Sequence, residues 1–218
     1  MGPTDTVVGD EPPTPTGRSL AATDAPEPRN AAWASRAGGD CAIAVVIPSY
    51  KVKAHVLSVI AQIGPEVGAI YVVDDACPDN SGDHVEANCT DRRVRVIRNA
   101  VNLGVSGATL AGMMRAADDG AAVVVKLDGD GQMDPALIPN FVGVILAGEA
   151  DYAKGNRFFE PEGVAQMPAV RLIGNAALSF MAKFSTGYWH SFDPTNGYFA
   201  VHAAIVRLLP TEKIAKRF

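Results

Sequence analysis

The 218-residue chain contains few cysteines, no long apolar run and no excess of basic residues. Its three cysteines, Cys41, Cys77 and Cys89, are odd in number and show no C-x-x-C spacing, which disfavours a disulfide framework or a zinc site. No stretch of about 18 apolar residues predicts a membrane-spanning helix. The net charge of -5 argues against a protein that neutralises nucleic-acid phosphates. With no secretory signal pattern, we expect a cytoplasmic protein with reduced thiols.

Several common ligand-binding signatures are also missing. The sequence has no G-x-x-x-x-G-K-[ST] loop and no complete G-x-G-x-x-G, so neither a nucleotide triphosphatase nor a nicotinamide-binding site is indicated. An EF-hand loop starting at Asp128 would need Gly and Glu where Met133 and Pro139 stand. A sugar-phosphate nucleotidyltransferase would need a Gly-rich loop after the first strand, and none is present.

The first 40 residues differ from the rest of the chain. They contain six prolines and only a few large apolar residues, too few to offset the entropy lost when a backbone becomes ordered. We therefore expect a disordered tail over 1–40 and one domain over 41–218.

Apolar runs and helical patterns alternate after residue 41. Strands are expected at 42–47, stopped by Pro48, and at 69–73, 94–97, 121–127 and 151–154, and helices at 54–63, 81–88, 106–117 and 135–147. This order predicts an α/β fold with a mainly parallel sheet covered by helices. In such sheets ligands bind beyond the carboxyl ends of the strands.

The residues that follow three of the expected strands are aromatic or acidic. Pro48-Ser49-Tyr50 follows the first strand, Asp74-Asp75 the second, and a loop containing Asp128 and Asp130 the fourth. A turn or helix cap explains Asp74-Asp75 equally well. In the third group, two carboxylates one residue apart, with Gly129 and Gly131 beside them, suit a hard divalent ion that bridges to a diphosphate.

Six ordered strings carry a resemblance to a known family: VVIPSY, VVDDACPDNSGD, NAVNLGVSGA, KLDGDGQMDP, KGNRF and DPTNGYFAVH. Over about 42–209 the chain resembles the family 2 glycosyltransferases. It is most similar to the branch of dolichyl-phosphate mannose synthase and bacterial polyprenyl-phosphate or cell-surface-polysaccharide sugar transferases. The resemblance implies the Rossmann-like GT-A fold and sugar transfer, with inversion, from a UDP- or GDP-sugar to a lipid-phosphate or glycan acceptor.

The same resemblance implies roles on the donor side. Pro48 and Tyr50 match a nucleotide-contacting segment, and Asp75, with Asp74 beside it, matches the acid that binds the base. Asp128 and Asp130 match the D-x-D pair that holds Mg²⁺ or Mn²⁺ on the diphosphate, where Asp128 also contacts the nucleotide and Asp130 counts as catalytic. In addition, Gln132 matches a third metal-side residue.

On the acceptor side, Arg157 matches a phosphate-facing catalytic arginine. Asp193 and the turn Asn196-Gly197-Tyr198 match an element near the sugar and acceptor. A lipid phosphate is already an anion and needs little help from a base, whereas a hydroxyl acceptor needs one. Asp193 is then the candidate base, ahead of His190 and His202, for which surface or packing roles are the better interpretation.

Two features depart from the family pattern. Lys51-Val52-Lys53 stands where relatives usually carry Asn-Glu, which puts the ribose contacts in doubt, and relatives continue past the position of Phe218. We therefore expect a chain truncated on its acceptor side, for which a non-catalytic nucleotide-sugar or partner-binding module is the alternative function. The apolar pattern at 171–184 suits packing against the sheet, contact with a membrane surface, or self-association into a homo-oligomer.

Overall fold

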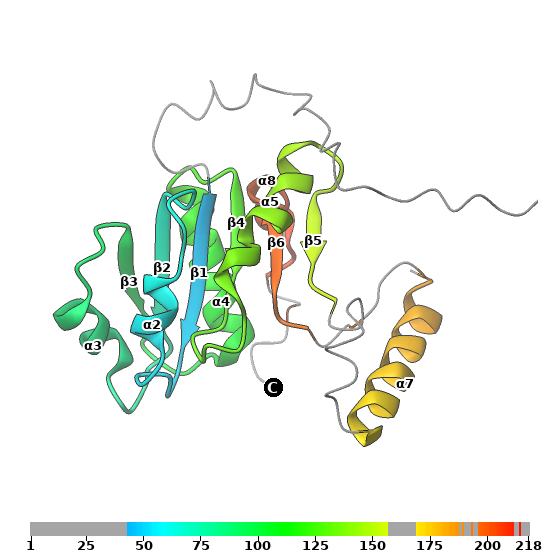
Figure 1. The fold of residues 1–218 in the computed structure, drawn as a ribbon, viewed down its shortest axis with the longest axis horizontal. Helices are drawn as coiled ribbons and strands as arrows, with labels where there is room; N and C mark the ends of the chain where they lie inside the picture. The colour runs from blue at the N-terminus through cyan, green and yellow to red at the C-terminus, as the bar shows by residue number, and fades with distance from the viewer. Residues whose placement is uncertain are drawn as a thin grey trace, which may run out of the picture.

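The computed structural model describes residues 43–156, 169–187, 189, 193, 196–211 and 214. The expected disordered tail, Arg157 and His190 lie outside these residues. Within the described part, six strands form one sheet in the order β3-β2-β1-β4-β6-β5 (Figure 1). Their bounds are β1 Ile43–Ser49, β2 Ala69–Asp74, β3 Val94–Arg98, β4 Val123–Lys126, β5 Tyr152–Lys154 and β6 Phe199–His202.

The first four strands of the sheet are parallel, and β6 is antiparallel to both of its neighbours, β4 and β5. The expected α/β fold with a mainly parallel sheet is therefore confirmed. The helices are α2 Val56–Ala61, α3 Ser81–Asn88, α4 Gly104–Asp118, the 3-10 turn η1 Pro135–Leu137, α5 Ile138–Leu146, α7 Ala169–Thr186 and α8 Ala203–Leu208.

Two apolar cores lie on the two faces of this sheet. One core joins β1, β2 and β4 to buried residues of α2, α3 and α5, such as Val56, Val85 and Val142. The other joins the opposite faces of the same strands to α4 and α8. The alternation of side chains along each strand separates the two sets, because successive residues point to opposite faces. The sheet is therefore buried on both sides, as its continuous apolar runs predict.

Helix α4 packs closely against the sheet at Gly112. A Cβ atom on Gly112 would overlap Val46 and would stand 2.8 Å from Val73 Cγ2, so only glycine permits this approach. Because α4 begins at Gly104, this packing fixes the start of the helix beside the ends of β1 and β2.

The prediction that the first strand stops at Pro48 is wrong, because β1 continues to Ser49. Its pairing with β4 ends at Val46, whose carbonyl accepts a hydrogen bond from the Leu127 N–H at 3.0 Å. Because successive residues of a strand direct their backbone groups to opposite neighbours, the nitrogen of Pro48 points toward β4, as that of Val46 does. It lies beyond the last hydrogen bond between β1 and β4, so the N–H that proline lacks interrupts no pairing. Strand β6 and helix α8 were not expected from the sequence.

Helix α7 stands away from the sheet (Figure 1). Its large apolar side chains are exposed, including Ile173, Phe180 and Phe184 at 69%, 60% and 77%. In the structure, this segment therefore does not pack against the sheet. Among the described helices, α7 included, none combines the length and apolarity that crossing a membrane requires.

Candidate functional site

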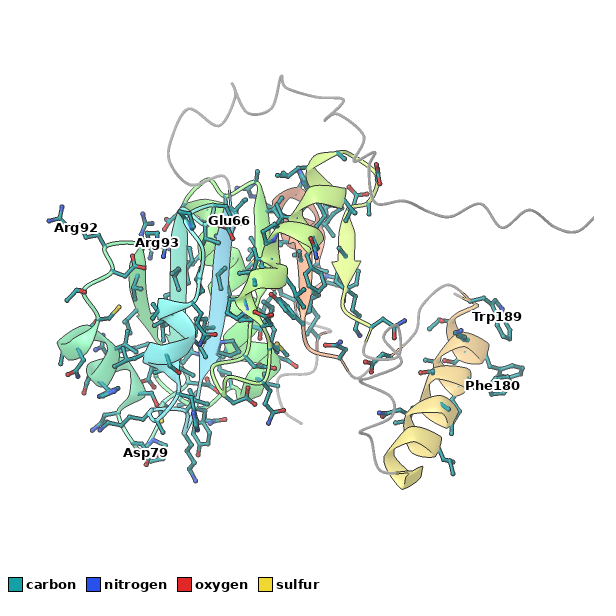
Figure 2. The ribbon with its side chains drawn as sticks, viewed as in Figure 1. Glu66, Asp79, Arg92, Arg93, Phe180 and Trp189 are labelled. Atoms are coloured by element: carbon teal, nitrogen blue, oxygen red, sulfur yellow. The ribbon has the colours of Figure 1, made fainter. Side chains whose placement is uncertain are left out.

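A pocket of about 380 Å³ opens where β1, β2 and β4 end and α4 begins. It is lined by Pro48, Ser49, Tyr50, Val52, Asp75, Asn102, Gly104, Val105, Ala108, Asp128, Gly129 and Asp130. Figure 2 marks this edge of the sheet by Asp79, in the loop after β2, whereas Glu66 and Arg93 mark the opposite edge. The structure thus brings together Pro48, Tyr50, Asp75, Asp128 and Asp130, all of them predicted site residues.

The turn after β1 presents Tyr50 at the rim of the pocket. Tyr50 is 43% exposed, and the Lys51 ammonium lies 5.5 Å from the centre of its ring. Lys51 adopts φ 57°, and its N–H donates to Cys77 Sγ at 3.1 Å, which ties this turn to the loop after β2. Burial alone would raise the pKa of the Cys77 thiol, but hydrogen bonds from Ser81 and from the backbone outweigh it and lower that pKa.

Asp75 is a buried carboxylate on the pocket wall. Its Oδ1 accepts hydrogen bonds from Asn99 Nδ2 at 2.8 Å and from the Leu103 N–H at 2.9 Å. Its own N–H donates to the Ser49 carbonyl at 3.2 Å. Two loops therefore hold one oxygen of this carboxylate in place. Sequence reasoning missed Asn99 and Leu103, although both lie within one of the six strings.

Asp74 is also buried but is absent from the pocket lining. Its Oδ1 accepts from the Cys77 N–H at 2.8 Å and its Oδ2 from the Gly82 N–H at 2.6 Å. The residue before α3, Asn80, makes no side-chain cap bond, so Asp74 satisfies the start of that helix from the end of β2. The geometry matches the helix-cap interpretation of Asp74, while its nucleotide role stays a prediction.

The loop after β4 carries the D-x-D pair. Gly129 is enclosed between Ile47 and Val52, where a Cβ atom would lie 3.1 Å from each side chain. Asp130 is exposed and its Oδ1 accepts from the Gln132 N–H at 3.0 Å. Gly131 adopts φ 81°, which glycine reaches without strain. The tight loop thus places both carboxylates on the pocket.

Lys126, the last residue of β4, is a functional candidate that sequence reasoning missed. It is 5% exposed, and its Nζ lies 2.5 Å from Asp128 Oδ1. The available signal was a lysine within an otherwise apolar strand, two residues before an acid.

The turn before β6 lies directly against this ion pair. A Cβ atom on Gly197 would stand 2.7 Å from Lys126 Nζ and 3.3 Å from Asp128 Oδ2. The neighbouring Asn196 accepts a hydrogen bond from the Tyr198 N–H through its Oδ1 at 2.9 Å. The structure therefore joins the predicted acceptor turn to the D-x-D loop, although the two are about 70 residues apart in the sequence.

Tyr198 anchors this turn. Its hydroxyl donates to the Asp134 carbonyl at 2.9 Å, and its ring lies 4.5 Å from that of Phe141. Burial, together with the charge of Asp134, raises the pKa of the Tyr198 phenol above its ordinary value. A neutral, buried phenol suits a role in positioning the turn.

The remaining acceptor-side candidates separate in space. Asp193 is fully buried, adopts φ 55°, and its carbonyl accepts from the Asn196 N–H at 3.1 Å, so it belongs to the same turn. His202 pairs with Val123 at the start of β4, far from the strand's carboxyl end, and its Nδ1 accepts from the Ala204 N–H. Strand β6 therefore carries His202 away from the predicted acceptor turn, which excludes His202 as a base near the acceptor.

The D-x-D loop suits a hard divalent cation. Asp128 and Asp130 provide carboxylate oxygens at the pocket, and Gln132 can add an amide oxygen, which are donors that Mg²⁺ and Mn²⁺ accept. Within the described ranges no three His, Cys, Asp or Glu side chains gather as a metal site, so water or ligand oxygens would complete the coordination. A diphosphate provides such oxygens.

Comparison with known proteins decides the family. The sequence matches the profile of "Glycosyl transferase family 2" over residues 44–209. The chain belongs to glycosyl transferase family 2. This range contains every predicted site residue, from Pro48 to Tyr198.

Two curated proteins are similar to this chain. The chain is 28% identical over 193 residues to a UDP-N-acetylglucosamine--dolichyl-phosphate N-acetylglucosaminyltransferase of Methanococcus voltae, covering 82% of this chain and 76% of that protein. It is 27% identical over 169 residues to a dolichol-phosphate mannosyltransferase of Pyrococcus furiosus, covering 75% of this chain and 47% of that protein. The chain thus spans about half to three quarters of these relatives.

A solved structure shares the fold of this family 2 chain. It is the glucosyl-3-phosphoglycerate synthase of Mycobacterium tuberculosis in complex with Mn²⁺, UDP-glucose and phosphoglyceric acid. The TM-score is 0.58 at 23% identity, over 79% of this chain and 59% of that one. The similarity supports the GT-A arrangement of the sheet and its flanking helices.

Proposed function

We propose that this family 2 chain transfers a sugar, with inversion, from a nucleotide-diphosphate sugar to a polyprenyl-phosphate acceptor. The observation that carries the proposal is the pocket, in which Asp75 lines one part and Asp128 with Asp130 another, at the ends of the two strands that flank β1. A nucleotide sugar needs separate contacts for its base and its diphosphate, and these residues can supply both. The two dolichyl- and dolichol-phosphate relatives favour a lipid phosphate over a glycan acceptor.

The nucleotide would bind between Tyr50 and Asp75. Because Asn99 and Leu103 hold one oxygen of Asp75, the carboxylate is oriented before ligand arrives, and its other oxygen can accept from an N–H of the base. Uracil and guanine both present such an N–H, so a UDP- or a GDP-sugar fits. The exposed ring of Tyr50 offers a surface for the base or ribose.

The diphosphate would face the D-x-D loop. Asp128, Asp130 and Gln132 are the residues that would hold Mg²⁺ or Mn²⁺, which, when bound, neutralises charge that develops on the leaving diphosphate. Asp130 is the more exposed of the two acids, and while its Oδ1 accepts from the Gln132 N–H, its other oxygen can face an incoming ligand. Arg157 remains our prediction for a further cation on the leaving group.

The acceptor would approach from the turn before β6. A lipid phosphate carries an ionised oxygen at neutral pH and can attack the anomeric carbon without a base. The turn Asn196-Gly197-Tyr198 would then position the acceptor beside Asp128. For a hydroxyl acceptor, Asp193 is the residue we would assign as base. Because such lipid acceptors are membrane-bound, we place the protein at the cytoplasmic face of a membrane.

Nucleotide titration tests the proposal. Calorimetry with UDP and GDP, with and without Mn²⁺, should show that one of them binds and that Mn²⁺ strengthens the binding. The Asp128→Ala/Asp130→Ala variant should lose the Mn²⁺-dependent part, about tenfold or more, because it lacks both metal-side carboxylates. The matched control is Asp118→Ala, an exposed acid at the end of α4, which should bind like wild type.

Unchanged binding in the double variant, or no nucleotide binding by the wild type, would contradict the proposal. Transfer of labelled sugar from the bound nucleotide to a polyprenyl phosphate in detergent separates an enzyme from the alternative of a non-catalytic binding module. That module would bind the nucleotide sugar and release no labelled lipid.

A further inference from the structure

Strand β4 carries one charged residue among buried apolar ones. All four of its positions are buried, and Lys126 follows three valines. Burial of an ammonium group is unfavourable unless the group is paired and hydrogen-bonded. An apolar residue would serve the sheet better at this position, so the lysine calls for an explanation in the site that it faces.

The surroundings of Lys126 are specific. Its Nζ contacts Asp128 Oδ1 at 2.5 Å, and the backbone of Gly197 closes over it so tightly that a Cβ atom there would lie 2.7 Å away. Asp128 itself is only partly buried, with 30% of its side chain exposed. The ammonium is thus enclosed beneath the pocket, while the carboxylate that it pairs with reaches into the pocket.

We propose that Lys126 is a positioning residue that occupies one oxygen of Asp128 and balances its charge, so that metal and nucleotide bind together and not metal first. This inference rests on the function proposed above for Asp128 and Asp130. With Lys126 in place, the pair of acids presents one net negative charge to a divalent ion, and without it two. The diphosphate of the donor supplies the missing negative charge.

The proposal predicts a measurable coupling. Mn²⁺ should bind weakly to the protein alone and more tightly when nucleoside diphosphate is present, and by linkage Mn²⁺ should strengthen nucleotide binding by the same factor. Removal of the ammonium should raise the affinity for Mn²⁺ alone and thereby reduce this coupling factor. A lysine that only stabilised the strand would leave the coupling unchanged.

The experiment titrates Mn²⁺ by electron paramagnetic resonance, without and with the nucleoside diphosphate that wild type binds. Lys126→Gln keeps a hydrogen-bond donor and removes the charge, and we expect it to bind Mn²⁺ alone about fivefold more tightly than wild type. Lys126→Met is the second neutral variant and should change in the same direction. Arg92→Gln, which removes an exposed cation at the opposite edge of the sheet (Figure 2), is the matched control and should behave like wild type.

A double-variant comparison locates the effect. In an Asp128→Asn background, Lys126→Gln should no longer tighten Mn²⁺ binding, because residue 128 then carries no carboxylate whose charge Lys126 could balance. Far-UV circular dichroism and melting temperature confirm that each protein is folded, and Lys126→Met is decisive if Lys126→Gln does not fold.

The outcomes separate the two proposals. If wild type shows nucleotide binding coupled to Mn²⁺, but the folded neutral variants bind Mn²⁺ alone no more tightly, the role of Lys126 is overturned and the proposed function stands. If wild type binds Mn²⁺ neither alone nor with UDP or GDP, both are overturned.

Discussion

At the scale of single residues, the site contains two glycines that pack closely against their neighbours. Gly129 is enclosed between Ile47 and Val52, and Gly197 lies against Lys126 and Asp128. Neither adopts a positive φ, so the requirement for glycine at these positions comes from close packing and not from backbone conformation.

Substitution of Gly197 tests this packing. Gly197→Ala should lower the transfer rate, or Mn²⁺-dependent nucleotide affinity, by about tenfold, because its Cβ would displace Lys126 and disturb Asp128. The matched control is Gly143→Ala in α5, where a Cβ would meet nothing within 4 Å. That change should leave binding intact and stabilise the protein by about 0.5–1 kcal/mol. Normal binding by folded Gly197→Ala would contradict the prediction.

Sequence reasoning at this scale found the acids of the pocket but not what holds them. Asp75 and Asp128 were predicted because acids after strands of a parallel sheet meet at one edge. Lys126 was not predicted as a site residue, because its apolar neighbours indicate only a buried strand. A charged residue in such a strand indicates a functional site only when its ion-pair partner is known. Pro48 was misjudged for a similar reason: whether its missing N–H matters depends on where the neighbouring strand ends.

At the scale of elements, the carboxylate of Asp74 anchors the loop between β2 and α3. Asp74 accepts hydrogen bonds from the N–H groups of Cys77 and Gly82, and the latter lies in the first turn of α3. By contrast, the carboxylate of Asp75 accepts its hydrogen bonds from Asn99 and Leu103, on the other side of this described loop, and none from the loop itself. The two adjacent acids therefore contact different elements: Asp74 binds the start of α3, and Asp75 binds the loop before α4. We expect their substitutions to have different effects.

Replacement of Asp74 should mainly affect stability. Asp74→Ala leaves two backbone N–H groups without their buried acceptor and should reduce the free energy of unfolding by about 1–3 kcal/mol, measured by chemical denaturation. Asp79→Ala, an exposed acid of the same loop, should change it by less than about 0.5 kcal/mol. Asp75→Ala should instead weaken nucleotide binding. Loss of nucleotide binding by Asp74→Ala at unchanged stability would restore its predicted role as a nucleotide contact.

At the scale of the whole molecule, α7 gives the protein an exposed apolar surface. Phe180 stacks with Phe184 at 6.5 Å and meets Trp189 edge-on at 6.4 Å, and Phe180 and Trp189 project away from the sheet (Figure 2). Residues 169–187 contain Arg171 and Lys183 but no acidic residue. Exposed aromatic side chains in a segment with basic and no acidic residues are typical of helices that bind anionic membranes, and we predict such binding for α7.

Vesicle binding tests the predicted contact of α7 with a membrane surface. Phe180→Ser/Phe184→Ser should reduce co-sedimentation with phosphatidylglycerol vesicles by about tenfold or more, because two apolar rings no longer enter the interface. The melting temperature should not change, since these side chains do not pack against the sheet. Leu208→Ser, which removes an exposed apolar side chain from α8, should bind vesicles like wild type. Equal vesicle binding, with a change in oligomeric state, would favour self-association instead.

The order of elements was predictable as far as β5, because alternating apolar runs and helical patterns are local signals. Strand β6 was not predictable. Its four residues are too few for a periodic pattern, and their place between β4 and β5 depends on pairing with residues far away in the sequence. The same limit applies to the site, since nothing local shows that Gly197 meets Asp128.

The position of β6 also has a consequence for the time course of folding. The parallel strands β1 to β4 all lie within residues 43–126, whereas β6 begins only at residue 199 and must insert beside β4 after some 70 further residues have been made. Because a chain is synthesised from its N-terminus, the parallel strands are available for pairing before β6 is. We therefore expect the nucleotide pocket to form early and the acceptor turn to dock last, so that the newly made chain can hold a nucleotide before it can receive a lipid.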